Sequence, residues 1–172
     1  NDAHGDFGRW RQISLPFVSL KEKEEHLFGQ VRTGIIRPAG TATLPDLLHS
    51  LRAGRCLVTS GPSLWLELIT ETGPPCTPGD TCTGAPRKLH IAADSTPAFG
   101  PLARVTLCIG DLQRKKETRR PLPIGPAGSM NLTLDEPARE LPGQGYLRLE
   151  VSSDREGTPF HCFSNPIYLA WR

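Results

Sequence analysis

The chain has 172 residues, enough for one large domain or two small ones with a buried core. Its net charge of +2 lacks the basic field expected of a nucleic-acid-binding protein, and no apolar run approaches the roughly 20 residues that a membrane span needs. With 17 glycines and 17 prolines, it disfavours long helices and favours short strands joined by turns.

The N-terminal third is expected to mix extended chain with one helix. An extended segment is predicted at 12–18, and the charged stretch 21–26 is typical of an exposed helical turn or loop. The helix follows, with Thr43 as its N-cap and Gly54 as the residue just past its end. Its apolar positions keep helical spacing: Leu44, Leu47, Leu48 and Leu51. A strand at 56–59 comes next.

From residue 61 onward the pattern is almost wholly that of β-strands. Apolar residues alternate in six segments, with a loop rich in Pro, Gly and Thr at 73–86. The alternating sets are Leu64, Leu66 and Leu68; Leu89, Ile91 and Ala93; Val105, Leu107 and Ile109; Met130, Leu132 and Leu134; Leu147, Leu149 and Val151; and Ile167, Leu169 and Trp171. Five to seven short strands over about 110 residues predict an antiparallel β-sandwich of immunoglobulin-like kind.

Several polar groups in this part suggest a structural role rather than a site. The basic cluster 114–120 is expected to be a solvated loop rather than a phosphate-binding patch. Asp80, Asp94 and Asp111 fall in turn-rich stretches, where Asp commonly bonds its own backbone. The five cysteines match no zinc-ribbon spacing. Cys76 and Cys82 either form a disulfide in an oxidising compartment or remain thiols.

The histidines give no clustered motif. His49 is expected on the helix surface, and His90 should point outward from its strand because Leu89 and Ile91 take the other face. His161 and Cys162 are adjacent on a strand and therefore face opposite ways. No nucleophile elbow, phosphate loop or dinucleotide fingerprint is present in the sequence.

The stretch that suggests chemistry is Asn1-Asp2-Ala3-His4-Gly5. In extended chain, alternate side chains share a face, so Asp2 and His4 project together. A carboxylate and an imidazole at this spacing make a compact pair of ligands for a divalent metal. Neither residue is expected to act as a nucleophile.

Three segments together resemble the PHP-domain metal-dependent hydrolases of the CehA/McbA type. They are the Asp2-Ala3-His4-Gly5 start, the helix–strand segment from Leu51 to Pro62, and the late Ser164-Asn165-Pro166-Ile167-Tyr168-Leu169. The resemblance implies that residues 1–60 are a short α/β remnant of a distorted β/α barrel. It further implies that residues 61–172 are an accessory β-sandwich domain.

The resemblance implies that Asp2 and His4 match the family's last metal-ligand motif. The earlier ligand motifs, rich in His, Asp and Glu, have no counterpart here, and a multimetal site needs more than two ligands. The chain is therefore expected to be the C-terminal fragment of a bacterial phosphoesterase-like hydrolase, inactive alone. The divalent metal (zinc, manganese or iron) would be bound in the complete protein, whose substrate is a small phosphorylated or ester compound.

Two further expectations follow from this interpretation. Arg9 and Arg11, on either side of Trp10, either contact an anionic substrate at the barrel mouth or cap the barrel. The helix at 44–51 should expose an apolar face that the missing barrel portion or another chain covers. The alternative interpretation of the whole chain is a non-catalytic β-sandwich module that binds a protein or a glycan.

Overall fold

The computed structural model describes residues 12–15, 18–21, 30–37, 40, 43–125, 129–135 and 140–171. The chain divides into two compact units, Asn1–Arg32 and Thr33–Arg172. In the first unit, β1 (Gln12–Leu15) pairs antiparallel with β2 (Val18–Lys21). The extended chain predicted from residue 12 is thus present in β1, and most of the charged stretch 21–26 lies outside the described residues.

The rest of the described chain holds one helix and eleven strands, so the protein is mainly β, as predicted. The helix is α1 (Leu44–Arg52). The strands are β3 (Arg32–Ile35), β4 (Cys56–Thr59), β5 (Ser63–Thr70), β6 (Thr81–Cys82), β7 (Pro86–Asp94), β8 (Leu102–Asp111), β9 (Lys116–Leu122), β10 (Met130–Asp135), β11 (Gln144–Arg155), β12 (Thr158–Ser164) and β13 (Ile167–Ala170).

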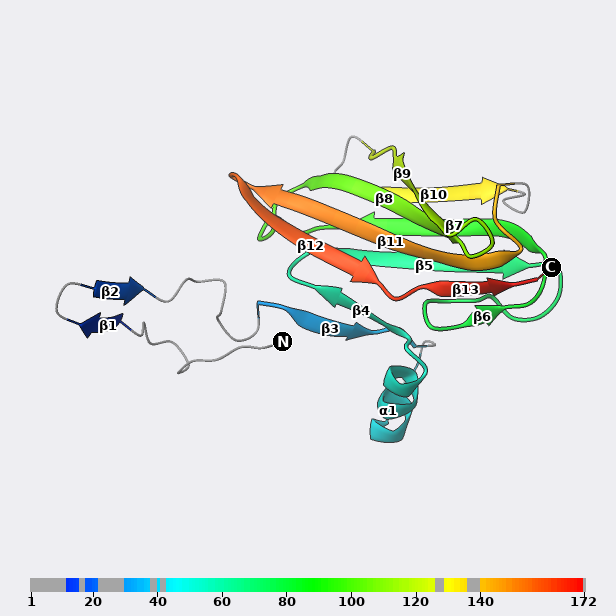
Figure 1. Cartoon of the computed structure of the whole chain (residues 1–172), viewed down its shortest axis with the longest axis horizontal. Helices are drawn as coiled ribbons and strands as arrows, with labels where there is room; N and C mark the ends of the chain where they lie inside the picture. The colour runs from blue at the N-terminus through cyan, green and yellow to red at the C-terminus, as the bar shows by residue number, and fades with distance from the viewer. Residues whose placement is uncertain are drawn as a thin grey trace. The chain divides into compact units, whose positions relative to one another are not determined.

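These strands form two sheets of unequal size (Figure 1). The smaller sheet has the order β10-β7-β5 and is antiparallel throughout. The larger has the order β3-β4-β12-β11-β13-β6, with β8 on β11 and β9 on β8. Strand β11 organises it: one edge pairs with β13 and then β12, and the other pairs with β8. The short β6 joins β13 in parallel.

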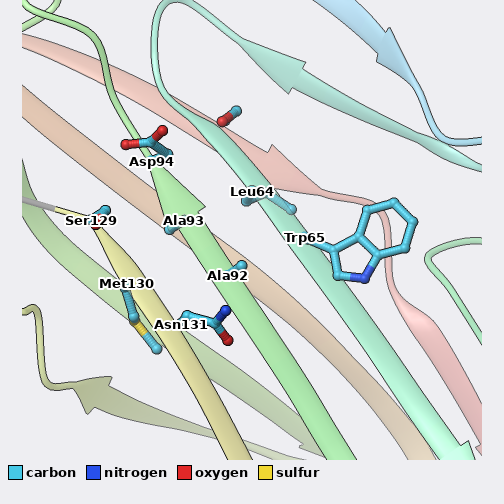
Figure 2. Close-up of a pocket in the computed structure, with 9 residues that line it drawn as sticks. Leu64, Trp65, Ala92, Ala93, Asp94, Ser129, Met130 and Asn131 are labelled. Atoms are coloured by element: carbon cyan, nitrogen blue, oxygen red, sulfur yellow. The ribbon is translucent and has the colours of Figure 1, made fainter.

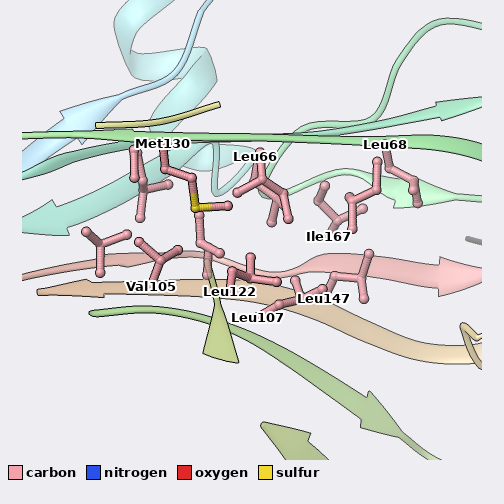
Figure 3. Close-up of a cluster of buried hydrophobic side chains, with 14 of the residues drawn as sticks. Leu66, Leu68, Val105, Leu107, Leu122, Met130, Leu147 and Ile167 are labelled. Carbon is pink, nitrogen blue, oxygen red and sulfur yellow. The ribbon is translucent and has the colours of Figure 1, made fainter. Parts of the chain in front are cut away.

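Buried side chains from both sheets meet in one hydrophobic cluster (Figure 3). The cluster includes Leu66, Leu68, Leu89 and Ile91 from the smaller sheet, and Leu107, Leu147, Leu149 and Ile167 from the larger, each at most 1% exposed. The alternation predicted in these strands is confirmed: one face is dry and the next residue along points away from it. The two sheets thus share one hydrophobic interior.

Helix α1 has the termini that the sequence predicts. Thr43 Oγ1 accepts from Asp46 N, and Asp46 Oδ2 accepts from Thr43 N at 3.0 Å, which completes a capping box. Gly54, at φ +72°, lies just past the C-terminal end, where a left-handed residue closes the last turn. The helix exposes the apolar surface expected of it, because Leu44, Leu48 and Leu51 are 68%, 42% and 41% exposed.

The structure bears out the expected loop at Arg114 and Lys115, which lie in a turn, and corrects it for residues 116–120. Residues Lys116–Leu122 form β9, which pairs antiparallel with β8 from Asp111↔Lys116 to Val105↔Leu122. An edge strand with one exposed face can carry many charges and even a proline such as Pro121, so its sequence lacks apolar alternation. The described part of 61–172 also holds nine strands rather than five to seven, because β6, β9 and β12 were not expected.

Candidate functional site

Asp2 and His4, the predicted metal ligands, lie outside the described residues, as do Arg9, Trp10 and Arg11. Their roles therefore stay predictions. Within the part of the chain that the structure describes, no group of three or more His, Cys, Asp or Glu side chains is placed to hold a metal ion. Nor does any helix there have the length and apolar character to cross a membrane.

Two of the segments that carry the family resemblance meet in the fold. We call this place the junction; it comprises residues 54–56, 77–80 and 165–168. Asn165 Nδ2 donates to the carbonyl oxygen of Gly54 at 2.8 Å across 111 positions of sequence. The backbone N–H of Asn165 donates to Cys56 O at 3.1 Å. The late Asn-Pro-Ile-Tyr segment thus closes the turn between α1 and β4.

The Thr77–Asp80 turn completes the junction through one carboxylate. Asp80 Oδ1 accepts from Arg55 Nε at 3.0 Å and from Arg55 Nη2 at 2.9 Å. Its Oδ2 accepts from the backbone N–H of Thr77 at 2.9 Å. The prediction that Asp80 bonds to the backbone of its own turn is confirmed. Both of its carboxylate oxygens accept hydrogen bonds within the chain, so Asp80 is not placed to act as a general acid or base.

Backbone groups of the same turn bind the late segment directly. Gly79 N donates to Pro166 O at 2.8 Å, and Tyr168 N donates to Asp80 O at 2.9 Å. Gly79 also lies against the end of α1: a Cβ built there would meet the carbonyl carbon of Gly54 at 2.6 Å. The junction is therefore a place where three backbone segments approach closely, and its hydrogen bonds hold these segments in position.

The outer face of the smaller sheet, which we call the sheet face, is the second feature. It consists of the residues of β5, β7 and β10 that alternate with the buried ones. The strand register sets them in rows, Trp65–Ala92–Asn131 and Glu67–His90–Thr133. His90 Nε2 lies 3.0 Å from Asn131 Oδ1, and His90 Nδ1 lies 3.8 Å from Glu67 Oε2. His90 thus points outward, as predicted.

A hollow of about 340 Å³ opens at one end of the sheet face. Its lining includes Ser63 and Asp94 at the ends of β5 and β7, and Trp65, Ala92 and Asn131 from the first row (Figure 2). In Figure 2, the Trp65 ring extends from β5 away from β7, and the Asn131 amide lies toward β7. Amide and carboxylate groups beside an indole give hydrogen-bonding capacity and an apolar edge.

The outer face of the larger sheet carries a set of paired charges, the charge network: Glu117, Arg119, Tyr146, Arg148 and Glu150. Arg148 Nη2 lies 2.9 Å from both carboxylate oxygens of Glu117, and Arg148 Nη1 and Arg119 Nη2 each bind Glu150. Tyr146 Oη donates to Glu117 Oε2 at 2.8 Å. Elsewhere in the basic cluster, Arg120 pairs with Glu140 and Arg114 with Asp111, so the three arginines of the cluster have carboxylate partners within the chain.

The pKa shifts in the charge network follow from these contacts. Burial opposes ionisation of Glu117, but hydrogen bonds from Tyr146 and Arg148 outweigh it, so the pKa of Glu117 lies below its usual value. For Glu150, burial is again outweighed by Arg148 and Arg119, and its pKa is also lowered. Burial works against the charge of Arg148, yet its carboxylate partners raise its pKa. The two glutamates and Arg148 are therefore ionised at neutral pH, as in a cluster with a structural role.

The remaining predictions about single polar residues hold. His49 is exposed on α1, and His161 is exposed whereas Cys162 is buried. Asp94 Oδ1 accepts from Ser95 N at 2.8 Å, and Asp111 Oδ1 accepts from Arg114 N at 3.0 Å, so both bond to their own turns. None of these residues is placed with the polar groups of the sheet face except Asp94.

Sequence reasoning did not identify Trp65, Glu67 and Asn131 as neighbours. The available signal was alternation, since Trp65 and Glu67 stand between buried leucines. Which outward residues share a row depends on the pairing of β5 with β7 and of β7 with β10, and no local pattern encodes that register.

Comparisons with protein-family models, with curated proteins and with solved structures give no match for this chain.

Proposed function

We propose that this chain is the C-terminal part of a PHP-type metal-dependent hydrolase that acts as a phosphoesterase. In this proposal, residues 61–172 are an immunoglobulin-like β-sandwich accessory domain and residues 1–60 belong to the end of the β/α barrel. The observation that supports it is the junction. Asn165 and Gly54 come from two separate segments of the resemblance, and they bind each other directly.

A shared structural purpose explains why those segments occur together. The helix–strand turn needs Gly54 for its left-handed backbone, and Asn165 adds a second donor to the Gly54 carbonyl, which already accepts from the backbone N–H of Cys56. The two segments are thus parts of one structural unit that joins the helix–strand segment to the β domain. Two-sheet packing around one core is also the arrangement that the accessory domain requires.

Asp2 and His4 would supply two ligands of the metal site in the complete protein. One carboxylate and one imidazole suit zinc, manganese or iron, but four to six ligands are usual, so the others come from other parts of the barrel. A bound divalent metal would lower the pKa of a water and polarise the phosphoryl oxygen. The exposed apolar side of α1, formed by Leu44, Leu48 and Leu51, would pack on that barrel or on another chain.

The test is metal content in the complete gene product and its variants. We expect stoichiometric zinc, manganese or iron by plasma mass spectrometry, with hydrolysis of bis-p-nitrophenyl phosphate. Asp2→Ala and His4→Ala should each lower the bound metal at least tenfold, whereas His49→Ala, in the exposed surface of α1, should not. Equal metal content in all four proteins would contradict the ligand assignment.

The sheet face favours a second candidate, the non-catalytic glycan-binding module. Glu67, His90 and Asn131 offer donors and acceptors in adjoining rows, and Trp65 offers an apolar surface at the β5 edge of the same sheet face. Sugars are bound by such combinations of hydrogen bonds and aromatic contact. Calorimetric titration with cellohexaose and xylohexaose tests this. Binding lost in Trp65→Ala but kept in Tyr168→Ala, at an exposed aromatic on the larger sheet, supports the module. No heat with either oligosaccharide counts against it.

A further inference from the structure

Two thiols of the chain lie against each other. All five cysteines are free, and Cys76 packs against the core cluster to which Cys82 belongs. Each of the two thiols affects the pKa of the other, as expected for side chains that lie close together. Cys82 is fully buried and Cys76 partly so. The Cys82 thiol also donates to Gly84 O at 3.3 Å. A disulfide between them requires the sulfurs to approach to about 2.05 Å.

The two cysteines belong to different sheets. Cys76 forms an isolated antiparallel bridge with Leu68 of β5, with N–H···O distances of 2.8 and 2.9 Å. Cys82 lies in β6, where it pairs with Leu169 of β13. A covalent bond between them would therefore link the edge of the smaller sheet to the edge of the larger one.

The segment between them is already held in a closed turn. Asp80 N donates to Thr77 O at 2.9 Å, and Asp80 Oδ2 accepts from both Thr77 N and Thr77 Oγ1. Gly79 supplies the positive φ of +95° that the turn needs. The backbone thus brings the two ends of the segment together without help from the sulfurs.

We propose that Cys76 and Cys82 are a dithiol pair that a small-molecule disulfide, such as oxidised glutathione, converts into a disulfide. In the first step the Cys76 thiolate attacks one glutathione sulfur, forms a mixed disulfide and releases one glutathione thiolate. The Cys82 thiolate then attacks Cys76 Sγ, forms the Cys76–Cys82 bond and releases the second glutathione. Two S–H bonds are lost from the protein, and the two electrons and two protons reside in two reduced glutathiones.

The surroundings of the pair make this exchange slow at neutral pH. Burial, together with the neighbouring Cys82 and Asp80, raises the pKa of Cys76 to about 12. The pKa of Cys82 is also raised, chiefly by burial. Arg55 faces this loop too, but its guanidinium binds Asp80. Because the thiolate is the attacking species, the rate should rise about tenfold per pH unit between pH 7 and 10.

The bond would fix the segment that holds the junction together. The Thr77–Asp80 turn lies between the two cysteines and supplies the contacts to Arg55, Pro166 and Tyr168. Closing this short loop restricts the unfolded chain and should raise the Tm by about 5–10 °C. The redox state of the pair would thus set how firmly α1 and β4 are attached to the β domain.

Peptide mapping tests the pair directly. The chain is incubated with oxidised glutathione at pH 9, alkylated, and digested with trypsin, Glu-C and Asp-N. The cuts at Glu71, Asp80 and Arg87 leave Cys76 in 72–79 and Cys82 in 80–87, with Cys56 in a separate peptide. We expect the first two peptides to be joined, at two hydrogens below the sum of their masses. Alkylated or singly glutathionylated peptides alone, or a link to Cys56, would overturn the proposal.

Stability provides the second readout. Oxidised and reduced wild-type chains should differ in Tm by the shift given above. The same treatment should leave the Tm of Cys76→Ser and Cys82→Ser within 1–2 °C of their reduced forms, and Cys56→Ser should behave like the wild type. If either serine variant fails to fold, the mass measurement on the wild type still decides. An equal shift in the serine variants would also overturn the proposal.

Discussion

The junction and the charge network both use polar side chains to join distant strands, but they do so with different partners. In the junction, Asn165 and the Thr77–Asp80 turn bind backbone groups at positions where the chain approaches itself closely. In the charge network, Arg148 binds side chains of β9 and β11 on the outer face of the larger sheet, where its side chain is 26% exposed. The junction depends on the close approach of three backbone segments, whereas the network joins side chains alone, of which the charged ones keep between 18% and 52% of their surface exposed.

This difference makes the junction the more sensitive region. A backbone carbonyl or a close glycine contact has no alternative conformation to adopt when its partner changes. Long charged side chains can turn toward solvent at little cost in free energy. We therefore expect single changes in the junction to destabilise the protein more than single changes in the network.

The largest effect should come from Gly79→Ala. An added Cβ would meet Ala53 O, Gly54 C at 2.6 Å and Arg55 N at 2.8 Å, all of them backbone atoms, at a φ of +95°. Neither the clash nor the backbone angle can be relieved by a side-chain rotation, so the free energy of unfolding should fall by about 3–5 kcal/mol. Urea denaturation followed by circular dichroism measures this loss.

Gly73→Ala is the matched control for that variant. Gly73 has a similar φ of +90°, but nothing lies within 4 Å of the added Cβ. Its loss should be limited to the cost of the left-handed backbone, about 1–2 kcal/mol. If the two alanine variants lose the same amount, the close approach of Gly79 to the end of α1 contributes nothing, and the junction is looser than described.

A smaller effect is expected for Asn165→Ala. The variant removes an amide that donates to Gly54 O at 2.8 Å and to Cys56 Sγ at 3.3 Å, although Gly54 O keeps the backbone N–H of Cys56 as a donor. At about 0.5–1.5 kcal/mol for each lost hydrogen bond, the change should cost about 1–3 kcal/mol. Asn131→Ala also removes a side-chain hydrogen bond, the 3.0 Å contact with His90, but at an exposed site. Thermal denaturation should show a lower Tm for the first variant only. Equal Tm values would mean that water replaces the Asn165 amide.

The contrast also shows what the sequence can predict. Helix α1 was predicted with both ends because capping at Thr43 and Gly54 depends on residues within a few positions. The strands of the core were predicted from alternation, as at Leu147, Leu149 and Val151. Strand β9 was missed because an edge strand with one open face needs no apolar residues.

The sites depend on information that local patterns lack. Arg55 and Asp80 are 25 positions apart, and Trp65 and Asn131 reach one face only through two strand registers. The sequence singled out the Asn165 segment through a family resemblance, but the partner of its side chain became evident only from the fold. Asp2 and His4, the residues with the clearest chemical signal, lie outside the described residues, so their role stays a prediction.

The smallest of these effects, and the one that depends on pH, is expected for Arg148→Met in the charge network. The variant keeps most of the apolar stem but removes the partner of Glu117 and Glu150, whose side chains are 25% and 18% exposed. At pH 7 we expect a loss of about 1–2 kcal/mol. The pKa values of both carboxyls are lowered in the folded state, so their stabilising effect is present above the unfolded pKa of about 4.3. It disappears as the pH falls through the lower folded values.

The wild type should therefore lose stability between pH 5 and 3 more steeply than Arg148→Met, and the two curves should converge at the acid end. Arg120→Met removes an ion pair whose side chains are 43% and 63% exposed, and it should change neither the stability nor the slope measurably. Urea titrations at pH 7, 5 and 3.5 on the three proteins measure both. Parallel curves for the wild type and Arg148→Met would show that these carboxylates owe their low pKa to other neighbours, since removal of the guanidinium would then leave their ionisation unchanged.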